Sequence, residues 1–252
     1  MSDAATLPTT RDEDWRYSDA QFLAAADADA ITAWRTLDVP AGETRREVIT
    51  YAPAETGMTD RLRVNVGEGA RFEAFAILSG SAYQRLEVEV TLADGAHFEF
   101  GGVTIGGGDN VREFVTRTIH AEPNATSNQV VRAVHWDSAI GNFLGRIEVA
   151  RDAQKTDAAQ NFRAILLNKG ASANTKPELE IFADDVQCAH GAAIGQLDEA
   201  AAYYMASRGL PPEAARSLLI RAFLADAFAE MADDSEAERM LELALSPMDA
   251  AP

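Results

Sequence analysis

The sequence contains a single cysteine, no long apolar run and few basic residues. Cys188 is the only cysteine among 252 residues, which excludes an internal disulfide and fits a reducing compartment. No run approaches the roughly 18 apolar residues that a membrane-spanning helix needs. The first residues, MSDAATLPTTRDEDW, lack the apolar centre of a signal peptide. We therefore expect a cytoplasmic protein without a membrane partner.

Basic residues are scarce relative to acidic ones. The chain has 22 Lys and Arg against 40 Asp and Glu, which gives a formal net charge of −18. Nucleic acids and anionic lipids bind clustered cations, and no Lys/Arg run offsets this charge. The balance argues against nucleic acid as a main partner. We interpret the acidic excess as a solvated surface rather than as a specific acidic binding face.

Short runs of alternating apolar and polar residues fill the chain from residue 61 to about residue 185. Examples are RLRVNV, RFEAFAIL, RLEVEVTL and GRIEVA. An alternation of period two is typical of strands that bury one face. No helical spacing long enough for a βαβ crossover interrupts these runs, so a doubly wound parallel sheet is not expected.

The turns between these runs recur. GEGARFEAF at 67–75 and ADGAHFEFG at 93–101 align with an offset of 26 residues. Such a repeat, holding a few short strands, is what a stacked solenoid coil needs. An antiparallel sandwich contains similar strands but does not require recurring turns. The pattern therefore favours a mainly β fold, with a right-handed parallel β-helix as its core.

The same patterns divide the chain into three parts. Residues 1–40 form a polar N-terminal segment with a short Ala-rich helix, for which Ser18 or Asp19 is the expected N-cap. Residues 41–197 form the β-helix core. Residues 198–252 have helical spacing and form a C-terminal helical domain.

An apolar stripe marks the C-terminal helices. Its members follow the spacing i, i+3, i+4, i+7, i+8 and i+11: Ile220, Phe223, Leu224, Ala227, Phe228 and Met231. Such a stripe is usually buried within its own domain, and the alternative is a docking surface for another protein. Ser235 and Glu238 have the spacing of a capping box at the start of the last helix.

Cys188 and His190 are the sharpest local signal for chemistry. Residues i and i+2 of a strand point to the same face, so the thiol and the imidazole are expected to be neighbours. Both groups are ligands for iron or zinc, but two ligands are too few for a closed metal site. Either another chain supplies the remaining ligands or the pair is structural. The residues alone favour a buried structural cysteine beside a hydrogen-bonded histidine.

Other chemical motifs are weak or missing. His97, His120 and His135 lie in separate strands without ligand spacing and are interpreted as structural. Asp184 and Asp185 are adjacent and would point to opposite faces of a strand, so they cannot flank one glycosidic bond. GGGDN at 106–110 lacks the Lys-Ser/Thr of a P-loop, and no G-x-S-x-G, H-E-x-x-H or C-x-x-C motif is present. We find no self-sufficient active site.

Several ordered motifs match one known family. They are TKPELEIFADDVQCAHGAAIG, QLDEAAAYYMASRGL and EAARSLLIRAFLADAF, with FLGRIEVARDAQKTDAAQNFRAILL upstream and PTTRDEDWRYSD near the N-terminus. Through these motifs the chain resembles the SufB/SufD family of iron–sulfur cluster assembly, and within it the SufD branch. The resemblance is strongest from about residue 126 to residue 229. It implies a β-helix core followed by a C-terminal helical domain, in agreement with the repeat pattern.

The resemblance also implies partners and site residues. It implies a non-enzymatic scaffold subunit that pairs with SufB along the β-helix edge and docks the SufC ATPase through its C-terminal helices. The implied docking residues are Ile220, Phe223, Leu224 and Phe228. Cys188 and His190 would lie at the SufB interface, where an iron ion or a nascent cluster is held transiently and no cofactor is stably bound.

Two alternatives remain open at this point. One is a homodimeric or SufB-like cluster scaffold, and the other, from a different class, is a β-helix carbohydrate-active enzyme. The chain is short for the family, with much of the N-terminal helical region reduced, so the resemblance leaves open any sulfur-accepting or flavin-binding role located there. With one cysteine, the chain cannot relay sulfur through several thiols by itself.

Overall fold

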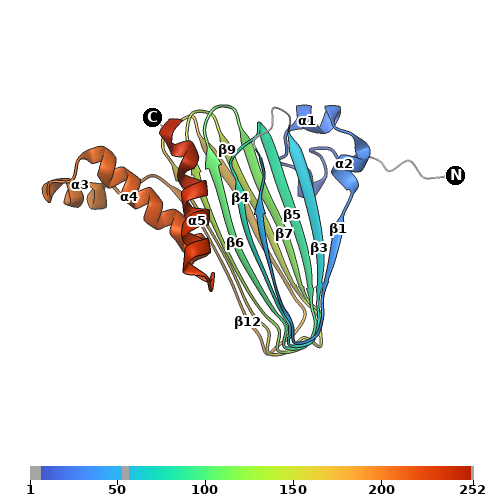
Figure 1. The fold of residues 1–252 in the computed structure, drawn as a ribbon. Helices are drawn as coiled ribbons and strands as arrows, with labels where there is room; N and C mark the ends of the chain where they lie inside the picture. The colour runs from blue at the N-terminus through green and yellow to red at the C-terminus, as the bar shows by residue number, and fades with distance from the viewer. Residues whose placement is uncertain (1–6, 53–56, 251–252) are drawn as a thin grey trace.

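The strands of this chain alternate between two parallel sheets. The computed structural model describes residues 7–52 and 57–250, and within them each sheet has six strands (Figure 1). The odd sheet contains β1 (Arg35–Val39), β3 (Met58–Val66), β5 (Tyr83–Leu92), β7 (Val111–His120), β9 (Ile140–Val149) and β11 (Ser172–Ile181). The even sheet contains β2 (Thr44–Thr50), β4 (Arg71–Leu78), β6 (His97–Gly106), β8 (Thr126–His135), β10 (Asp157–Leu166) and β12 (Gln187–Gly195).

Every strand pairs in parallel with the strand two places along the chain. Arg71 pairs with His97, and His97 pairs with Thr126. The 26-residue offset between Arg71 and His97 is the repeat seen in the sequence. The predicted β-helix is therefore confirmed. Strand pairing begins at Arg35 in β1, inside the segment assigned above to residues 1–40.

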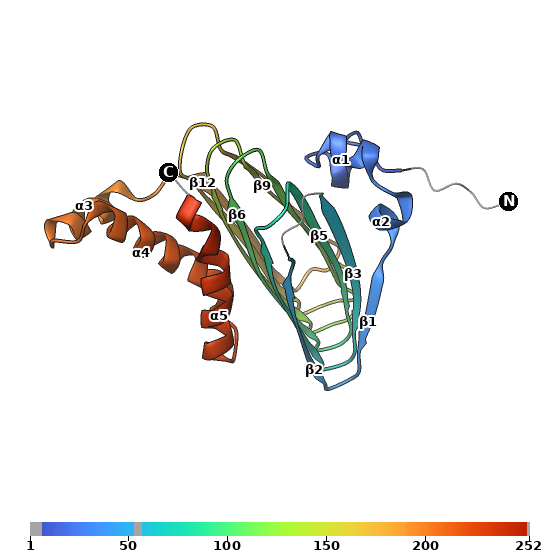
Figure 2. The same ribbon diagram turned by 45° about the horizontal axis from the view of Figure 1, so that its top comes forward.

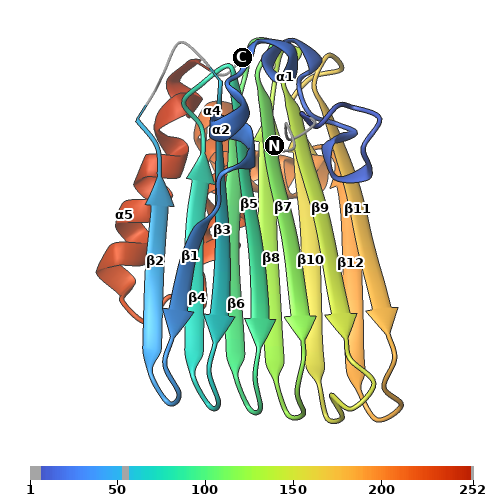
Figure 3. The same cartoon turned by 90° about the vertical axis from the view of Figure 1, so that its right-hand side faces the viewer.

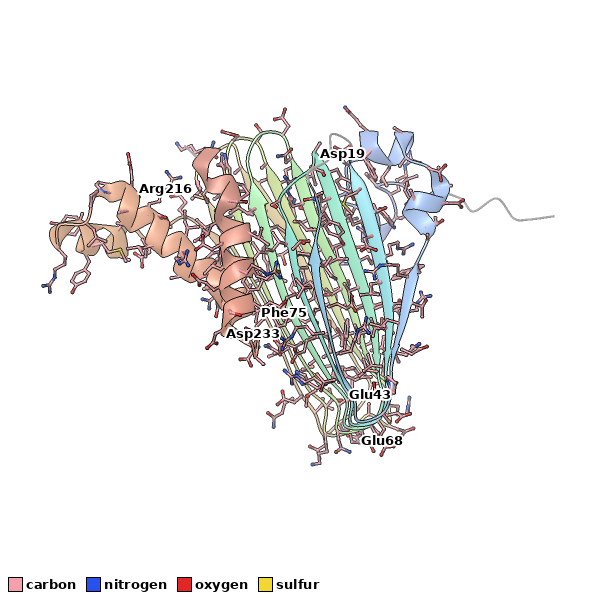
Figure 4. All side chains as sticks on the ribbon, in the orientation of Figure 1. Asp19, Glu43, Glu68, Phe75, Arg216 and Asp233 are labelled. Carbon is pink, nitrogen blue, oxygen red and sulfur yellow. The ribbon has the colours of Figure 1, made fainter. Side chains whose placement is uncertain are left out.

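The recurring turns form a column of left-handed corners at the narrow edge of the solenoid, where the two sheets meet. Glu43 and Glu68 mark this edge in Figure 4. Gly69 and Gly95 have φ of 62° and 65°, which glycine adopts without steric cost. Asn124 and Lys155 take the same position in the next two coils, with φ of 61° and 64°. The later repeats look weaker in sequence because residues other than glycine occupy this corner.

The interior of the solenoid changes along its length. The first coils are filled by side chains such as Leu62, Phe72 and Phe98, all fully buried, and the two phenylalanine rings stack with centroids 5.7 Å apart. Later coils also bury polar side chains, including Gln129 and Gln160. The later coils therefore combine buried polar side chains with apolar packing, in which the rings of Phe143 and Phe162 stack with centroids 5.7 Å apart.

A thin N-terminal layer lies over the wide end of the outer face of the odd sheet (Figure 3). It contains η1 (Glu13–Trp15), α1 (Ala20–Ala25) and α2 (Ala28–Thr32). Asp19, one of the two predicted N-caps, accepts hydrogen bonds from the amides of Gln21 and Phe22. Ser18 instead donates to Glu113 at 2.8 Å, and Glu113 also pairs with the fully buried Arg85.

A C-terminal helical layer covers part of the even sheet and extends away from it (Figures 1 and 2). It contains α3 (Glu199–Ser207), α4 (Pro212–Ala225), η2 (Asp226–Phe228), α5 (Asp234–Leu245) and η3 (Ser246–Ala250). The outward-facing Phe75 of β4 packs against Phe228, with ring centroids 6.5 Å apart (Figure 4). At Gly101 of β6 a Cβ atom would overlap with the carbonyl oxygen of Ala227, so glycine permits this close approach. We call α3 and α4 the arm.

The structure corrects one detail of the helical part. Asp233, not Ser235, is the N-cap of α5, because its carboxylate accepts from the amides of Ser235 and Glu236. The predicted capping box of Ser235 and Glu238 is therefore wrong, and Glu238 instead pairs with Arg221. The negative charge of Asp233 suits the positive end of the helix dipole. No helix among the described residues is long and apolar enough to cross a membrane.

Candidate functional site at the open end of the solenoid

The last coil of the solenoid leaves one free edge on each sheet. Within the described residues β11 pairs only with β9, and β12 pairs only with β10. Figure 3 shows β11 and β12 side by side at the same end of the molecule. No helix or loop of this chain pairs with these edges among the described residues, so their outward backbone groups have no strand partner.

Cys188 and His190 lie on the inner side of β12. Cys188 is in register with Ala158 and His190 with Gln160, and both of these β10 residues are buried inside the solenoid. The predicted placement of the thiol and imidazole on one face is therefore confirmed. Cys188 packs against the small cluster that contains Ile147, Val149 and Ala158, whereas His190 is exposed.

The environment of Cys188 disfavours the thiolate. Burial raises the pKa of the thiol, and the nearby Asp157 carboxylate raises this pKa further. A thiol with a raised pKa is a poor nucleophile and a poor metal ligand near neutral pH. Among the described residues, no group of three or more His, Cys, Asp or Glu side chains is placed to hold a metal ion. The role of Cys188 and His190 as transient metal ligands stays a prediction.

The backbone around this pair is available for strand addition. The amide of Gln187 donates to the carbonyl of Thr156, the residue just before β10. The odd-numbered amides of β12 therefore face β10. The even-numbered amides, including those of Cys188 and His190, consequently face the free edge. The strand QCAHGAAIG carries no Lys, Asp, Glu or Pro, which are the residues that usually protect an edge from pairing.

The free edge of β11 is less uniform. The amide of Ser172 donates to the carbonyl of Ala139, and the amide of Phe182 donates to the carbonyl of Val149. The even-numbered amides of β11 therefore face β9, and the odd-numbered amides face the free edge. Pro177 is at an odd-numbered position and has no backbone N–H, so the free edge of β11 has one hydrogen-bond donor fewer. Exposed apolar side chains complete this end of the molecule, since Ile181 is 39% exposed, Phe182 65% and Ile194 45%.

Three of the four residues implied for ATPase docking are covered by the chain itself. Ile220, Leu224 and Phe228 are buried against the even sheet, beside Phe75, Val103 and Trp136. Phe223 is half-buried, and Arg132 lies over its ring at 5.8 Å. The stripe also does not form one continuous helix, since α4 ends at Ala225 and the 3₁₀ turn η2 follows. The stripe attaches the helical layer to the solenoid.

The exposed residues of the arm were missed by sequence reasoning. Tyr203 is 78% exposed, Tyr204 59% and Leu218 47%, on α3 and α4. The sequence did contain a signal for this surface. Two adjacent tyrosines lie in a helix that has no strong apolar stripe, so they are not expected to be buried in a core.

The other three histidines and Asp185 make contacts within the fold, and Asp184 is exposed. His120 Nε2 and Ser127 Oγ share a hydrogen bond of 3.0 Å. Burial lowers the pKa of His120 to about 4. Burial and the nearby Arg112 lower the pKa of His135 to about 3. His97 contacts Thr126 at 2.7 Å, and Asp185 pairs with Lys155 at a corner.

These features define a class of protein: a parallel β-solenoid that ends in unpaired strands and carries a helical layer on one sheet. Residues 50–223 match the family model described as "SUF system FeS cluster assembly, SufBD core domain". Since the match covers more than half of the 252 residues, the chain belongs to the SufBD core family. The family resemblance drawn from the sequence motifs is thereby confirmed.

Several curated relatives are similar to this chain. An iron–sulfur cluster assembly SufBD family protein from Synechocystis is 35% identical over 62% of the chain and 35% of that relative. SufD from Escherichia coli is 35% identical over 48% of the chain and 29% of its own length. SufD from Bacillus subtilis is 33% identical over 55% of the chain and 32% of its length. The matched region is thus about a third of the length of each relative.

Proposed function

We propose that this chain acts in iron–sulfur cluster assembly as a SufD-like scaffold subunit that pairs with a SufB protein. The observation that carries the proposal is the unpaired edge of β12, which exposes the amides of Cys188 and His190 beside their side chains. Its support comes from membership of the SufBD core family and from the similarity to SufD proteins of two bacteria. A strand of the partner added at this edge would satisfy the free backbone groups.

In this proposal the metal-binding groups are shared between two chains. Cys188 and His190 supply two donor atoms, whereas an iron site needs about four. The partner would provide the others, and iron or a nascent cluster would be cargo that is held at the interface and passed on. Because Cys188 is held as a thiol, we assign the main contact to His190 and a secondary contact to Cys188. The chain itself would carry out no covalent step.

The arm is the proposed contact for the SufC ATPase. Tyr203, Tyr204 and Leu218 offer exposed apolar surface there, whereas Ile220, Leu224 and Phe228 hold the helical layer on the sheet. In this arrangement the buried stripe would transmit movement of the arm to the solenoid. We place the assembly in the cytoplasm, without a membrane or nucleic-acid partner.

Co-expression with the SufB and SufC proteins of the same host tests the partnership. We expect one complex, whose mass shows one copy of this chain, one of SufB and two of SufC. Tyr203→Asp with Leu218→Asp should release SufC and keep SufB, while Ala192→Lys on the edge of β12 should release SufB. A monomer or homodimer that ignores both proteins would contradict the proposal, and a homodimer would favour the alternative of a self-paired scaffold.

Substitution of His190 separates assembly of the complex from assembly of the cluster. We expect His190→Ala to leave the mass of the complex unchanged and to abolish cluster formation, measured by the visible absorbance of the anaerobically reconstituted complex. His97→Ala is the matched control, because His97 lies on the outer face of the even sheet, away from β12. Normal cluster yield with His190→Ala would remove His190 from the site.

A further inference from the structure

A row of polar side chains crosses the outer face of the odd sheet near its wide end. Arg85 on β5 is in register with Glu113 on β7, and Glu113 is in register with Asn142 on β9. Asn174 on β11 continues the row to the free edge of the sheet. Glu113 points away from the interior, because its neighbour Phe114 belongs to the interior core. Arg85, Glu113 and Asn142 are nevertheless fully buried, so another part of the chain covers them.

Hydrogen bonds connect the members of this row across four strands. Arg85 forms an ion pair with Glu113 through Nη1. Asn142 Nδ2 donates to the second carboxylate oxygen of Glu113 at 3.3 Å, and Asn174 Nδ2 donates to Asn142 Oδ1 at 2.9 Å. Among the described residues β11 pairs only with β9, so the row extends a buried side-chain network to an edge strand.

The N-terminal segment 13–18, which we call the strap, covers the row. Two of its backbone carbonyls accept hydrogen bonds from the buried side chains. Arg85 Nη1 donates to the carbonyl of Asp14 at 2.8 Å, and Asn142 Nδ2 donates to the carbonyl of Tyr17 at 3.1 Å. Figure 3 shows the N-terminal loop crossing the sheet as far as β11. Buried donors need partners, and the strap supplies two of them.

Side chains of the strap reach the first and the last strand of the row. The ring of Trp15 lies 3.8 Å from the guanidinium of Arg85 on β5. At the other end, Lys176 Nζ on β11 donates to Glu13 Oε1 at 2.6 Å, and these two residues are 163 positions apart in the sequence. The strap is thus connected to β11 in two ways, directly at Lys176 and through the hydrogen-bonded row at Asn174.

From these contacts we propose that the strap is a conformational device that holds β11 in place, so that the order of the open end depends on the N-terminal segment. Within the described residues β11 has one strand neighbour, and its side chains are half-buried or exposed. Segments with few buried contacts open locally while the rest of the fold persists, and a few hydrogen bonds then decide how often they open. The strap acts within the isolated chain, so this coupling does not depend on the proposed function.

Hydrogen–deuterium exchange of the full chain, measured by mass spectrometry, tests this coupling. Trp15→Ala removes the ring that anchors the strap on Arg85, and we expect exchange in β11 to rise roughly tenfold. Exchange in β4 and β6 of the other sheet should stay nearly unchanged. Leu23→Ala is the matched control, because Leu23 is buried in the same N-terminal layer but lies outside the strap. This control should raise exchange in α1 and leave β11 as it is.

A second variant changes the same connection from the side of β11. Asn174→Ala with Lys176→Ala should also raise exchange in β11, and adding Trp15→Ala should raise it little further, since all three substitutions break one connection. Unchanged exchange of β11 in Trp15→Ala would overturn the proposal, and so would an equal rise in Leu23→Ala. Effects of the strap and of the β11 substitutions that simply add would show two independent elements and would overturn it as well.

Ser18→Ala is a milder variant of the strap. It removes the hydrogen bond of 2.8 Å to Glu113 and keeps the ring of Trp15. Exchange in β11 should rise by a smaller factor than in Trp15→Ala. If Trp15→Ala does not fold, an unchanged exchange of β11 in Ser18→Ala would overturn the proposal.

Discussion

The two ends of the solenoid are finished in opposite ways. At the N-terminal end, polar pairs decorate the first coil: Arg35 and Tyr51 both contact Asp60, and Asn65 donates to Asp38 at 2.7 Å. At the C-terminal end, Ile181, Phe182 and Ile194 are exposed beside the uncharged strand β12. Charged side chains on an edge discourage the pairing of strands, whereas an uncharged edge invites it. The difference marks the edge of β12 as the one that is most open to pairing with another strand, since β11 at the same end carries Lys176, Pro177 and Glu178.

The last coil also differs from the first coils in how far its side chains are buried. Fully buried phenylalanines fill the first coils, and the odd sheet there is held from outside by Arg85, Glu113 and the ring of Trp15, 3.8 Å from the Arg85 guanidinium. The side chains of β11 are all half-buried or exposed. The N-terminal coils are therefore expected to be the stable part of the isolated chain, and the last coil to be its least stable part.

The largest expected effect comes from Arg85. Arg85→Met leaves Glu113 buried without its charge partner, and we expect a loss of about 3–5 kcal/mol in the free energy of unfolding. Urea denaturation measures this loss. Lys176→Met, which removes an exposed pair with Glu13 near the open end, should leave the free energy of unfolding nearly unchanged. Equal losses for the two variants would contradict the contrast between the ends.

Truncation of an apolar side chain should cost more stability in the first coils than in the last coil. Leu62→Ala removes a fully buried side chain of the first coils and should cost about 2–5 kcal/mol. Ile194→Ala should cost less than about 1 kcal/mol in the isolated chain, since that side chain is already 45% exposed. If a partner covers β12, Ile194→Ala should weaken the complex while Leu62→Ala does not act specifically on it. Affinity measured by biolayer interferometry with SufB checks this expectation.

Acid should destabilise the fold through the buried histidines. The pKa values of His120 and His135 are lowered to about 4 and about 3, whereas an unfolded histidine has its ordinary value near 6.5. As pH falls below about 6.5, the unfolded chain binds protons that the folded chain refuses, so stability is lost down to the folded values. Urea midpoints between pH 7 and pH 4 measure this dependence. His135→Gln should flatten this dependence, and an unchanged dependence in that variant would contradict the role of His135.

The smallest expected effect concerns the reactivity of Cys188. Since burial and Asp157 raise its pKa, alkylation by iodoacetamide should be slower in the folded chain than in urea at the same pH. The stability linked to this thiol is present below the unfolded pKa and decreases as pH rises toward the folded one. Asp157→Asn should lower the folded pKa and speed alkylation. Mass spectrometry of the alkylated chain gives the rates, and an unchanged rate would exclude Asp157 as a cause.

Much of the fold was predictable because its signals are local. The alternation of apolar residues identifies the strands, and the Gly-Ala corners at residues 69–70 and 95–96 identify the repeat. The i, i+2 spacing of Cys188 and His190 placed them on one face, as the register with Ala158 and Gln160 confirms. The cap of α5 was missed because Asp233 and Ser235 are both good N-caps, and their order along the chain does not decide between them.

The functional surfaces were harder to predict. The sequence of an apolar helical stripe does not show whether the stripe packs on its own sheet or on another protein. In the described chain, the packing of Phe228 on Phe75 shows that this stripe packs on its own sheet. The exposure of the tyrosines of the arm likewise depends on how distant segments pack.

The amino-acid sequence by itself determined the coil repeat, the strand faces, the acidic surface and the motif that joins Cys188 to His190, because each depends on neighbouring residues and on the two-residue period of a strand. The tertiary structure decided which edges stay unpaired and which apolar helix residues are buried. Those properties depend on burial and on pairing between strands about 30 residues apart in sequence, which no local pattern encodes.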